Sequence, residues 1–203
     1  MSIEIKLSKK PIPYKKAMLF LHKRVQQVKN GDNKELIWIL EHPKTYTAGV
    51  SFKQNEIIDK KIKVIKTNRG GKITLHNPGQ KIIYFVINLN NRKKDIRRLI
   101  NIIETSIIEF LKILKIQAHN DKKNIGIWVN EKKIAAIGLR ISRWVAYHGF
   151  SINISNNLKD YLKIIPCGLD NTKVTSIFSE IKIIPKNFEK KIVKILIKNI
   201  NKI

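Results

Sequence analysis

The chain has 203 residues, 43% of them hydrophobic, and carries 41 Lys and Arg against 15 Asp and Glu, a formal net charge of +26. This length predicts a single domain over residues 1–203, and the hydrophobic share excludes a disordered basic tail. No stretch approaches the roughly 18 consecutive apolar residues that a membrane span needs, and the N-terminus lacks the apolar segment of a secretory signal, so we expect a cytoplasmic protein. The single cysteine excludes a disulfide framework and a cysteine-rich metal site, and we expect no bound metal or cofactor.

Hydrophobic periodicity predicts a mixture of helices and strands. In chain order we expect a strand at 3–7, a helix at 13–29, strands at 35–40, 61–66, 72–76 and 81–89, a helix at 95–115, strands at 126–129, 133–141 and 145–154, and a helix at 187–203. Asn130 and Glu131 are expected to form the turn of a hairpin. This order favours an α/β fold of the α+β type, in which helices flank one mixed sheet.

The excess of positive charge has two explanations. Basic proteins commonly bind nucleic acid, because Lys and Arg neutralise phosphates and release counterions. However, 34 of the 41 cations are Lys and only seven are Arg, and they are spread along the whole chain. Abundant Lys, Ile and Asn are what AT-rich codons supply. A basic nucleic-acid-binding protein therefore stays an alternative, and we do not expect specific nucleic-acid binding.

Two residues are candidates for covalent chemistry. Cys167 lies between Pro166 and Gly168, where a turn can expose a thiol and bring backbone N–H groups toward a reacting oxygen. Without that context, a lone cysteine is more often a small buried hydrophobe. Lys133 opens a segment of small residues that allows close approach of a ligand, although most lysines are solvated surface residues.

A glycine-rich segment is the third candidate. Gly70 and Gly71, flanked by Arg69 and Lys72, predict either a tight turn or a close backbone approach to a ligand. His76 and His148 follow or end strand segments, where each is more often a hydrogen-bonded structural histidine than a catalytic one.

Several motifs follow one another along the chain: Glu41-His42-Pro43, Tyr46-Thr47-Ala48-Gly49, Arg69-Gly70-Gly71-Lys72-Ile73-Thr74-Leu75-His76-Asn77-Pro78-Gly79-Gln80, Gly126-Ile127-Trp128-Val129, Lys133-Ile134-Ala135-Ala136-Ile137-Gly138, Ser142-Arg143-Trp144-Val145-Ala146-Tyr147-His148-Gly149, Ile164-Ile165-Pro166-Cys167-Gly168 and Val174-Thr175-Ser176. Taken in this order, the motifs resemble those of one family, the octanoyltransferases of lipoate biosynthesis, and the similarity runs from about Glu41 to Ser176. The chain departs from the usual family pattern at Leu75, where Tyr is common, and at Asn77, where Gly is common.

The resemblance implies a fold related to the catalytic modules of lipoate and biotin protein ligases. It implies an acyltransferase that moves an octanoyl group from acyl carrier protein to a lysine of a lipoyl domain, in 2-oxo acid dehydrogenase E2 subunits and the glycine cleavage H protein. Cys167 is implied as the acyl-accepting nucleophile, with Lys133 as its partner. Substrate contacts are implied for Arg69, Gly70, Gly71, Lys72, Ile73, Thr74, Leu75, His76, Ala136, Ile137, Gly138, Gly149, Phe150 and Ser151.

An ATP-dependent lipoate or biotin protein ligase is the main alternative. Such an enzyme activates a free acid as an acyl-adenylate and needs no cysteine. The position of Cys167 between proline and glycine favours the transferase.

Overall fold

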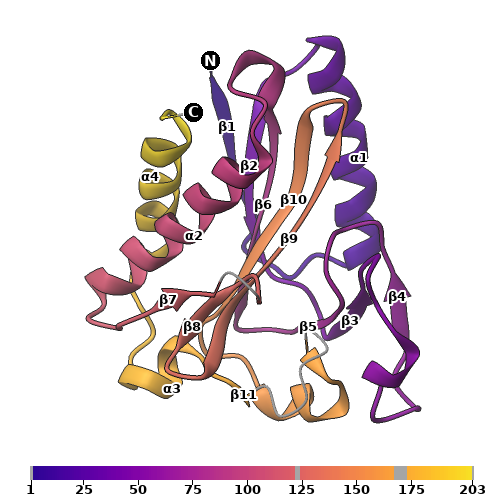
Figure 1. Ribbon diagram of the computed structural model, residues 1–203, viewed down its shortest axis with the longest axis vertical. Coiled ribbons are helices and arrows are strands. Elements are labelled where there is room, and N and C mark those ends of the chain that lie inside the picture. The colour runs from indigo at the N-terminus through magenta and orange to yellow at the C-terminus, as the bar shows by residue number, and fades with distance from the viewer. Residues whose placement is uncertain (1, 122–123, 167–172, 203) are drawn as a thin grey trace.

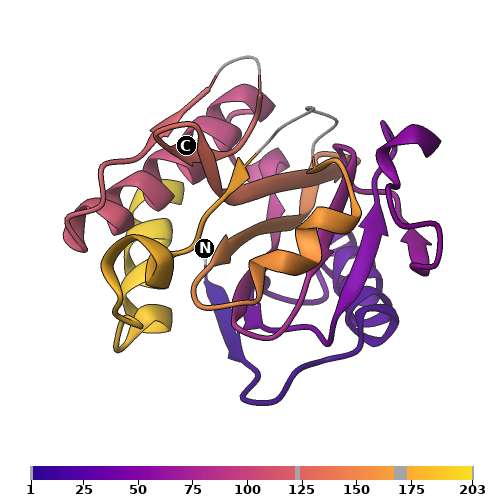
Figure 2. The same cartoon turned by 90° about the horizontal axis from the view of Figure 1, so that it is seen from below.

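A computed structural model describes residues 2–121, 124–166 and 173–202 of the chain. An eight-stranded mixed sheet lies between α1 (Tyr14–Asn30) on one face and α2 (Ile96–Ile113) and α4 (Phe188–Ile200) on the other, as Figure 1 shows. Figure 2 shows the same arrangement seen from below. The prediction of a mixed sheet flanked by helices is confirmed.

The strands of the large sheet are β1 (Ile3–Leu7), β2 (Glu35–Leu40), β6 (Gln80–Asn88), β7 (His119–Asn120), β8 (Ile127–Val129), β9 (Lys132–Ser142), β10 (Val145–Asn153) and β11 (Lys173–Val174). Their order is β1-β2-β6-β10-β9-β8-β7, and β11 pairs with β9 outside this path. β1 is parallel to β2 and β11 is parallel to β9, whereas the other pairs are antiparallel.

Each face of this sheet has its own apolar core. Met18 of α1 packs in a cluster with Trp38 of β2. On the opposite face, Leu99 and Phe110 of α2 pack with Phe188 of α4, and the two phenyl rings meet edge to face at 5.0 Å between centroids. Because both faces are covered, β2 and β10 are buried at every position, as expected for strands inside a layered fold.

A second, three-stranded sheet is formed by β3 (Thr45–Ala48), β4 (Val64–Lys66) and β5 (Ile73–His76), in the order β4-β3-β5. Its small core contains Tyr46, Leu75 and Tyr161, the last from the 3₁₀ helix η3 (Leu158–Lys163). The remaining helical segments are η1 (Gln54–Glu56), η2 (Leu89–Asn91) and α3 (Ile177–Ile181). Within the described part of the chain, no helix has both the length and the apolar character needed to cross a membrane.

The predicted helices and strands are all present, with ends that lie within three residues of the predicted ones. The predicted hairpin is also confirmed, since β8 and β9 pair antiparallel and Asn130 takes a left-handed turn conformation at φ 52°. The sequence analysis did not predict β3, β7, α3 and β11.

Candidate active site

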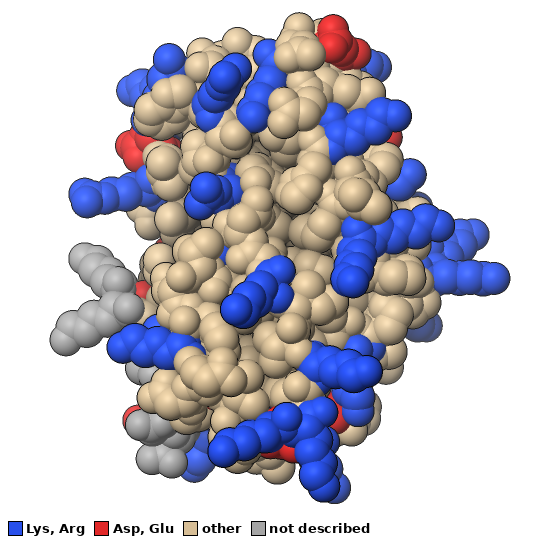
Figure 3. Space-filling model, turned by 90° about the vertical axis from the view of Figure 1, so that its right-hand side faces the viewer, with Lys and Arg blue, Asp and Glu red and all other residues tan. Residues whose placement is uncertain are grey.

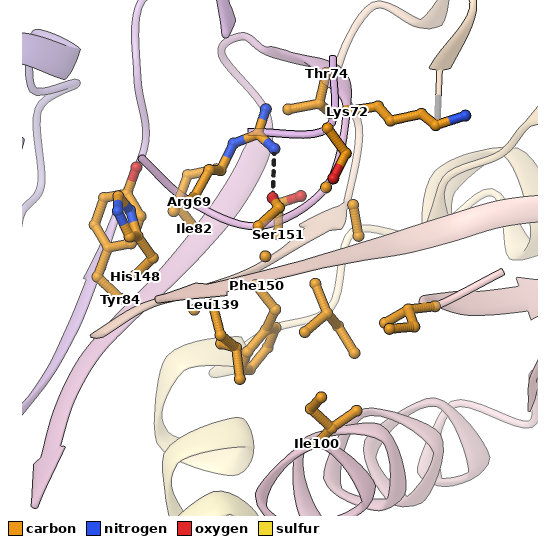
Figure 4. Close-up of a pocket in the computed structure, with 18 of the residues that line it drawn as sticks. Arg69, Lys72, Thr74, Ile82, Tyr84, Ile100, Leu139, His148, Phe150 and Ser151 are labelled. Atoms are coloured by element: carbon orange, nitrogen blue, oxygen red, sulfur yellow. Dashed lines mark hydrogen bonds between the residues drawn. The ribbon is translucent and has the colours of Figure 1, made fainter. Parts of the chain in front are cut away.

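An open cavity of about 550 Å³ is lined by residues of both sheets, of α2 and of the loops between them. Figure 4 shows Arg69, Lys72 and Thr74 on one side of the strands that cross it and Ile100, Leu139 and Phe150 on the other. Among the described residues, the cavity wall includes all the predicted site residues except Leu75. Cys167 lies outside the described residues.

Glycines bring the loop of residues 69–72 onto the large sheet. Gly138 of β9 and Gly149 of β10 are opposite each other in register, so neither strand has a side chain there. The Gly70 N–H donates a hydrogen bond to the Leu139 carbonyl at 2.9 Å. A Cβ atom at Gly138 would lie 3.1 Å from the Gly70 oxygen, which is tighter than ordinary van der Waals contact. The glycines therefore allow the loop backbone to contact β9 directly, while the predicted approach of this loop to a ligand stays a prediction.

Arg69 holds this loop against β3 by hydrogen bonds. Its guanidinium donates to the Thr47 carbonyl at 2.7 Å, to the Thr47 hydroxyl at 2.9 Å and to the Gly70 carbonyl at 3.0 Å. Lys72 is more exposed and lies 3.6 Å from the buried carboxylate of Glu56. The predicted loop thus combines a structural arginine with a lysine at the cavity wall.

The apolar part of the wall extends beyond the predicted residues. It includes Ile82 of β6, Leu139 and Ile141 of β9, and Ile96 and Ile100 of α2. Both α2 isoleucines lie on the apolar stripe of this helix. Helical periodicity alone does not say which part of the stripe packs against the sheet and which part faces a cavity. Branched aliphatic side chains of this kind suit a hydrocarbon ligand.

Lys133 is a second buried cation in this wall, in addition to Arg69. The side chain is 4% exposed, so the interpretation as a solvated surface lysine is wrong. Its Nζ donates to the Ile125 carbonyl at 3.1 Å and lies 4.7 Å from the centroid of the Trp128 ring. Gly126 makes room for it, because a Cβ atom there would be 2.8 Å from Lys133 Cε.

The chain on both sides of residues 167–172 comes close to Lys133. On the C-terminal side, Val174 of β11 is in register with Lys133, and the Thr175 N–H donates to the Lys133 carbonyl at 3.0 Å. On the N-terminal side, Pro166 lines a small cavity together with Lys133. Cys167 itself lies outside the described residues, but its neighbour in sequence is thus located beside the predicted partner.

His148 and Tyr84 lie together at one end of the cavity wall (Figure 4). The positive φ of His148, 68°, turns its ring to the same side as that of Tyr147, and the two rings stack at 4.9 Å. Since the Asn68 amide nitrogen donates to the Tyr147 hydroxyl, the Asn68 carbonyl oxygen accepts from His148 Nε2 at 2.8 Å. Burial, and secondarily the charge of Arg69, lower the pKa of His148 to about 3, so the imidazole is neutral.

His76 is a second buried, neutral histidine on the cavity wall. Burial, and secondarily the neighbouring His42, lower the pKa of His76 to about 3. Its Nδ1 is 2.8 Å from the side-chain oxygen of Gln80, an atom that only accepts, so Nδ1 carries the hydrogen. Both cavity histidines are therefore hydrogen-bonded and uncharged. This agrees with their interpretation as structural histidines.

The two departures from the family pattern lie in ordinary structural positions. Leu75 is fully buried in the core of the small sheet, away from the cavity wall, although its neighbour Thr74 faces the cavity. Asn77 donates to the Asn157 carbonyl at 2.9 Å and accepts from the Asn156 amide at 3.0 Å. Each residue thus has a packing or hydrogen-bonding role where it stands.

The comparison with known families assigns the chain to a class of protein. Residues 13–197 match the lipoyl protein ligase A/B catalytic domain, so the chain belongs to this family. Among solved structures, it resembles a lipoate-protein ligase A bound with ATP, with a TM-score of 0.78 at 13% identity over 99% of this chain and 86% of that one. At this identity the similarity shows the fold alone, and the predicted relation to ligase catalytic modules is confirmed at that level.

Its sequence relatives are more specific. The chain is 43% identical over 180 residues to an octanoyltransferase of Wolbachia sp. subsp. Brugia malayi, covering 86% of this chain and 88% of that protein. It is also 43% identical over 181 residues to an octanoyltransferase of Ehrlichia chaffeensis, covering 86% and 85%. The predictions of the octanoyltransferase family and of an acyltransferase enzyme are confirmed.

Proposed function

We propose that this protein transfers an octanoyl group from octanoyl-acyl carrier protein to a lysine amine of a lipoyl domain, through a thioester on Cys167. The acceptors are the lipoyl domains of 2-oxo acid dehydrogenase E2 subunits and the glycine cleavage H protein. The observation that carries the proposal is the position of Lys133, which is buried at an apolar cavity and lines a small cavity with Pro166, the residue before Cys167.

The first step is acyl transfer to the enzyme. The Cys167 thiolate attacks the thioester carbonyl of the carrier, a new C–S bond forms, and the C–S bond to the carrier breaks. The carrier thiolate leaves and takes up the proton of the Lys133 ammonium, which leaves Lys133 neutral for the second step. An ammonium group at Lys133 favours the thiolate of Cys167, because a nearby cation stabilises the charged form. One thioester replaces another, so the step needs no nucleotide.

The second step is aminolysis of the acyl-enzyme. The acceptor amine attacks as a free base, an amide bond forms, and the Cys167 thiolate leaves. The amine must lose a proton, and neutral Lys133 is the group proposed to take it. His76 and His148, with pKa values near 3, are weaker bases at neutral pH.

The octanoyl chain is proposed to occupy the apolar part of the cavity. Ile100, Leu139, Ile141 and Phe150 contribute aliphatic and aromatic surface there. Burial of a hydrocarbon chain is worth about 0.8 kcal/mol per methylene, so eight carbons supply several kcal/mol of binding. The length of the octanoyl group thus contributes to binding affinity without any polar contact.

The test is intact mass spectrometry after incubation with octanoyl-acyl carrier protein in the absence of nucleotide. We expect one octanoyl group on the wild-type chain, none on Cys167→Ser, and loss of the group when an apo lipoyl domain is added. Transfer by Cys167→Ser should fall by orders of magnitude while its circular dichroism spectrum stays native. Near-normal transfer by this variant would favour direct aminolysis, and a strict ATP requirement would favour the ligase.

A further inference from the structure

Gln80, at the start of β6, is fully buried and bonds to several parts of the site at once. Its side-chain nitrogen lies 2.9 Å from the Tyr161 hydroxyl, 2.9 Å from Asn153 Oδ1 and 3.2 Å from the Leu75 carbonyl. Its side-chain oxygen accepts from His76 Nδ1. One amide thus uses both of its ends inside the protein, where each lost bond is costly.

Two of these bonds lead to the segments that flank residues 167–172. Tyr161 belongs to η3, the segment that leads into Pro166. On the other side, Asn153 accepts from Gln80 and donates from its Nδ2 to the Thr175 carbonyl at 2.9 Å. The Thr175 N–H in turn bonds to the Lys133 carbonyl. Gln80 is therefore connected to both flanks and, through Asn153 and Thr175, to the backbone of Lys133.

The same residues also converge in space. Asn153, Tyr161, Pro166 and Lys133 line one small cavity. Asn153 is 4% exposed and Tyr161 is 7% exposed, so bulk water does not substitute for these bonds. Asn153 and Tyr161 do not line the larger cavity, whereas Lys133 lines both cavities and lies at the boundary between them.

We propose that Gln80 and Asn153 are positioning residues for acyl transfer, holding the two segments that flank Cys167 in place relative to Lys133. This inference rests on the proposed function. It adds a buried amide pair that touches no substrate and acts only through the chain segments it bonds. Misplacement of reacting groups by about 1 Å can reduce a rate on the order of a hundredfold, so such a pair affects turnover strongly.

The test compares Asn153→Ala with Asn199→Ala. Asn199 is a matched control because it is also a buried asparagine, bonded through Nδ2 to Ser106 and Glu109 at the contact of α2 and α4. For Asn153→Ala we expect kcat to fall by roughly tenfold or more, with a much smaller change in KM for octanoyl-acyl carrier protein. Asn199→Ala should lose stability but keep kcat.

Alkylation by iodoacetamide gives a readout that a merely structural role would not change. Cys167 is the single cysteine of the chain, so the alkylation rate reports this residue alone. We expect the rate at neutral pH to fall in Asn153→Ala and to stay at the wild-type value in Asn199→Ala. Tyr161→Phe, which removes one hydroxyl, is the milder second variant and should reduce both kcat and the alkylation rate.

Wild-type kcat and alkylation rates in folded Asn153→Ala and Tyr161→Phe would overturn the inference. If Asn153→Ala does not fold, Tyr161→Phe decides alone. Failure of the proposed function has a different signature, because the wild-type chain would then form no thioester on Cys167. The alkylation series does not depend on that outcome and still measures the effect of the Gln80–Asn153 pair.

Discussion

Lys132 and Lys133 are neighbours on β9 but have opposite environments, because successive strand residues point to opposite faces of a sheet. Lys132 is exposed, whereas Lys133 is buried against the Trp128 ring. A buried ammonium costs desolvation free energy, which a surface lysine avoids. Lys133 lies next to the segments that flank Cys167. Under the proposed function, its role in acyl transfer explains why a lysine is buried at this position.

Replacing Lys133 with Met keeps much of the side-chain volume and removes both the cation and the proposed base. We expect alkylation of Cys167 at neutral pH to slow, because the thiolate fraction falls without the nearby cation. Transfer to the lipoyl-domain amine should fall by about 10²- to 10⁴-fold, the usual contribution of general acid–base catalysis. The matched control Lys132→Met should change neither rate. The assignment is wrong if both variants behave like wild type, or if Lys132→Met is the damaging one.

The family resemblance predicted most of the cavity wall, because its motifs at residues 69–76, 133–138 and 149–151 contain most of the residues that line the cavity. The loop of residues 69–72 and the small residues at 136–138 meet as expected, with glycines at the contact. The inner wall was harder to predict. Tyr84 lies in a strand and Ile100 in a helix whose apolar patterns are typical of core segments. That these two side chains line a cavity depends on the tertiary packing of the strand and the helix, which a local pattern does not show. Strand alternation on β5 also explains Leu75, since Thr74 faces the cavity and Leu75 the opposite side.

At the scale of elements, long periodic segments were predictable and short ones were not. The residues of α2 repeat with helical spacing over five turns, so pattern alone identifies them. By contrast, β11 has two residues and exists because it pairs with β9, about 40 positions away in sequence. β3 likewise depends on pairing with β4 and β5, and α3 has five residues, too few to show a period. Long-range pairing leaves no local signal in a single sequence.

The unpredicted short elements nevertheless shape the site. β11 brings the chain that follows residues 167–172 to Lys133, and β3 supplies Thr47, which holds the Arg69 guanidinium. The sequence motifs therefore identified the residues of the site. The distances between these residues depend on the pairing of short strands that are far apart in the sequence. This division is the reason that residue identities were easier to predict than the geometry of the bonds that join Gln80 to both flanks.

At the scale of the whole molecule, a cluster of buried histidines makes stability depend on pH. Burial lowers the pKa of His42 to about 4, and the pKa values of His76 and His148 are about 3. In an unfolded chain each histidine titrates near a pKa of about 6.5. Between these values the unfolded state binds protons that the folded state does not, so the free energy of unfolding falls as the pH decreases from about 6.5 to about 4.

Urea unfolding at several pH values between about 7 and about 4.5 measures this effect. Each histidine contributes a slope of up to about 1.4 kcal/mol per pH unit, and most carboxylates titrate below this window. His148→Gln removes one of the three groups, so the slope of the free energy of unfolding against pH should become shallower. A free energy of unfolding that stays constant across the window would show that these histidines are protonated in the folded protein.

The net charge of +26 is the property of the molecule that most needs a functional test. In Figure 3, Lys and Arg side chains are spread over the visible face with few acidic residues between them, and they do not form one stripe. Under the proposed function the donor is an acidic carrier protein, so this field would speed encounter without requiring a dedicated patch. Screening shortens the range of such attraction from about 30 Å at 0.01 M salt to about 8 Å at physiological ionic strength.

We therefore expect kcat/KM for octanoyl-acyl carrier protein to fall by about tenfold or more over that range of salt, while kcat at saturating donor changes little. The reason is that long-range attraction mainly raises the association rate, whereas chain insertion and the orientation of the thioester are short-range. Octanoyl-pantetheine, a donor without net charge, is the matched control, and its kcat/KM should be nearly independent of salt. If both donors respond alike, salt acts on the enzyme itself. If neither responds, the excess of lysine reflects the codon composition of the genome and the carrier finds the enzyme without electrostatic steering.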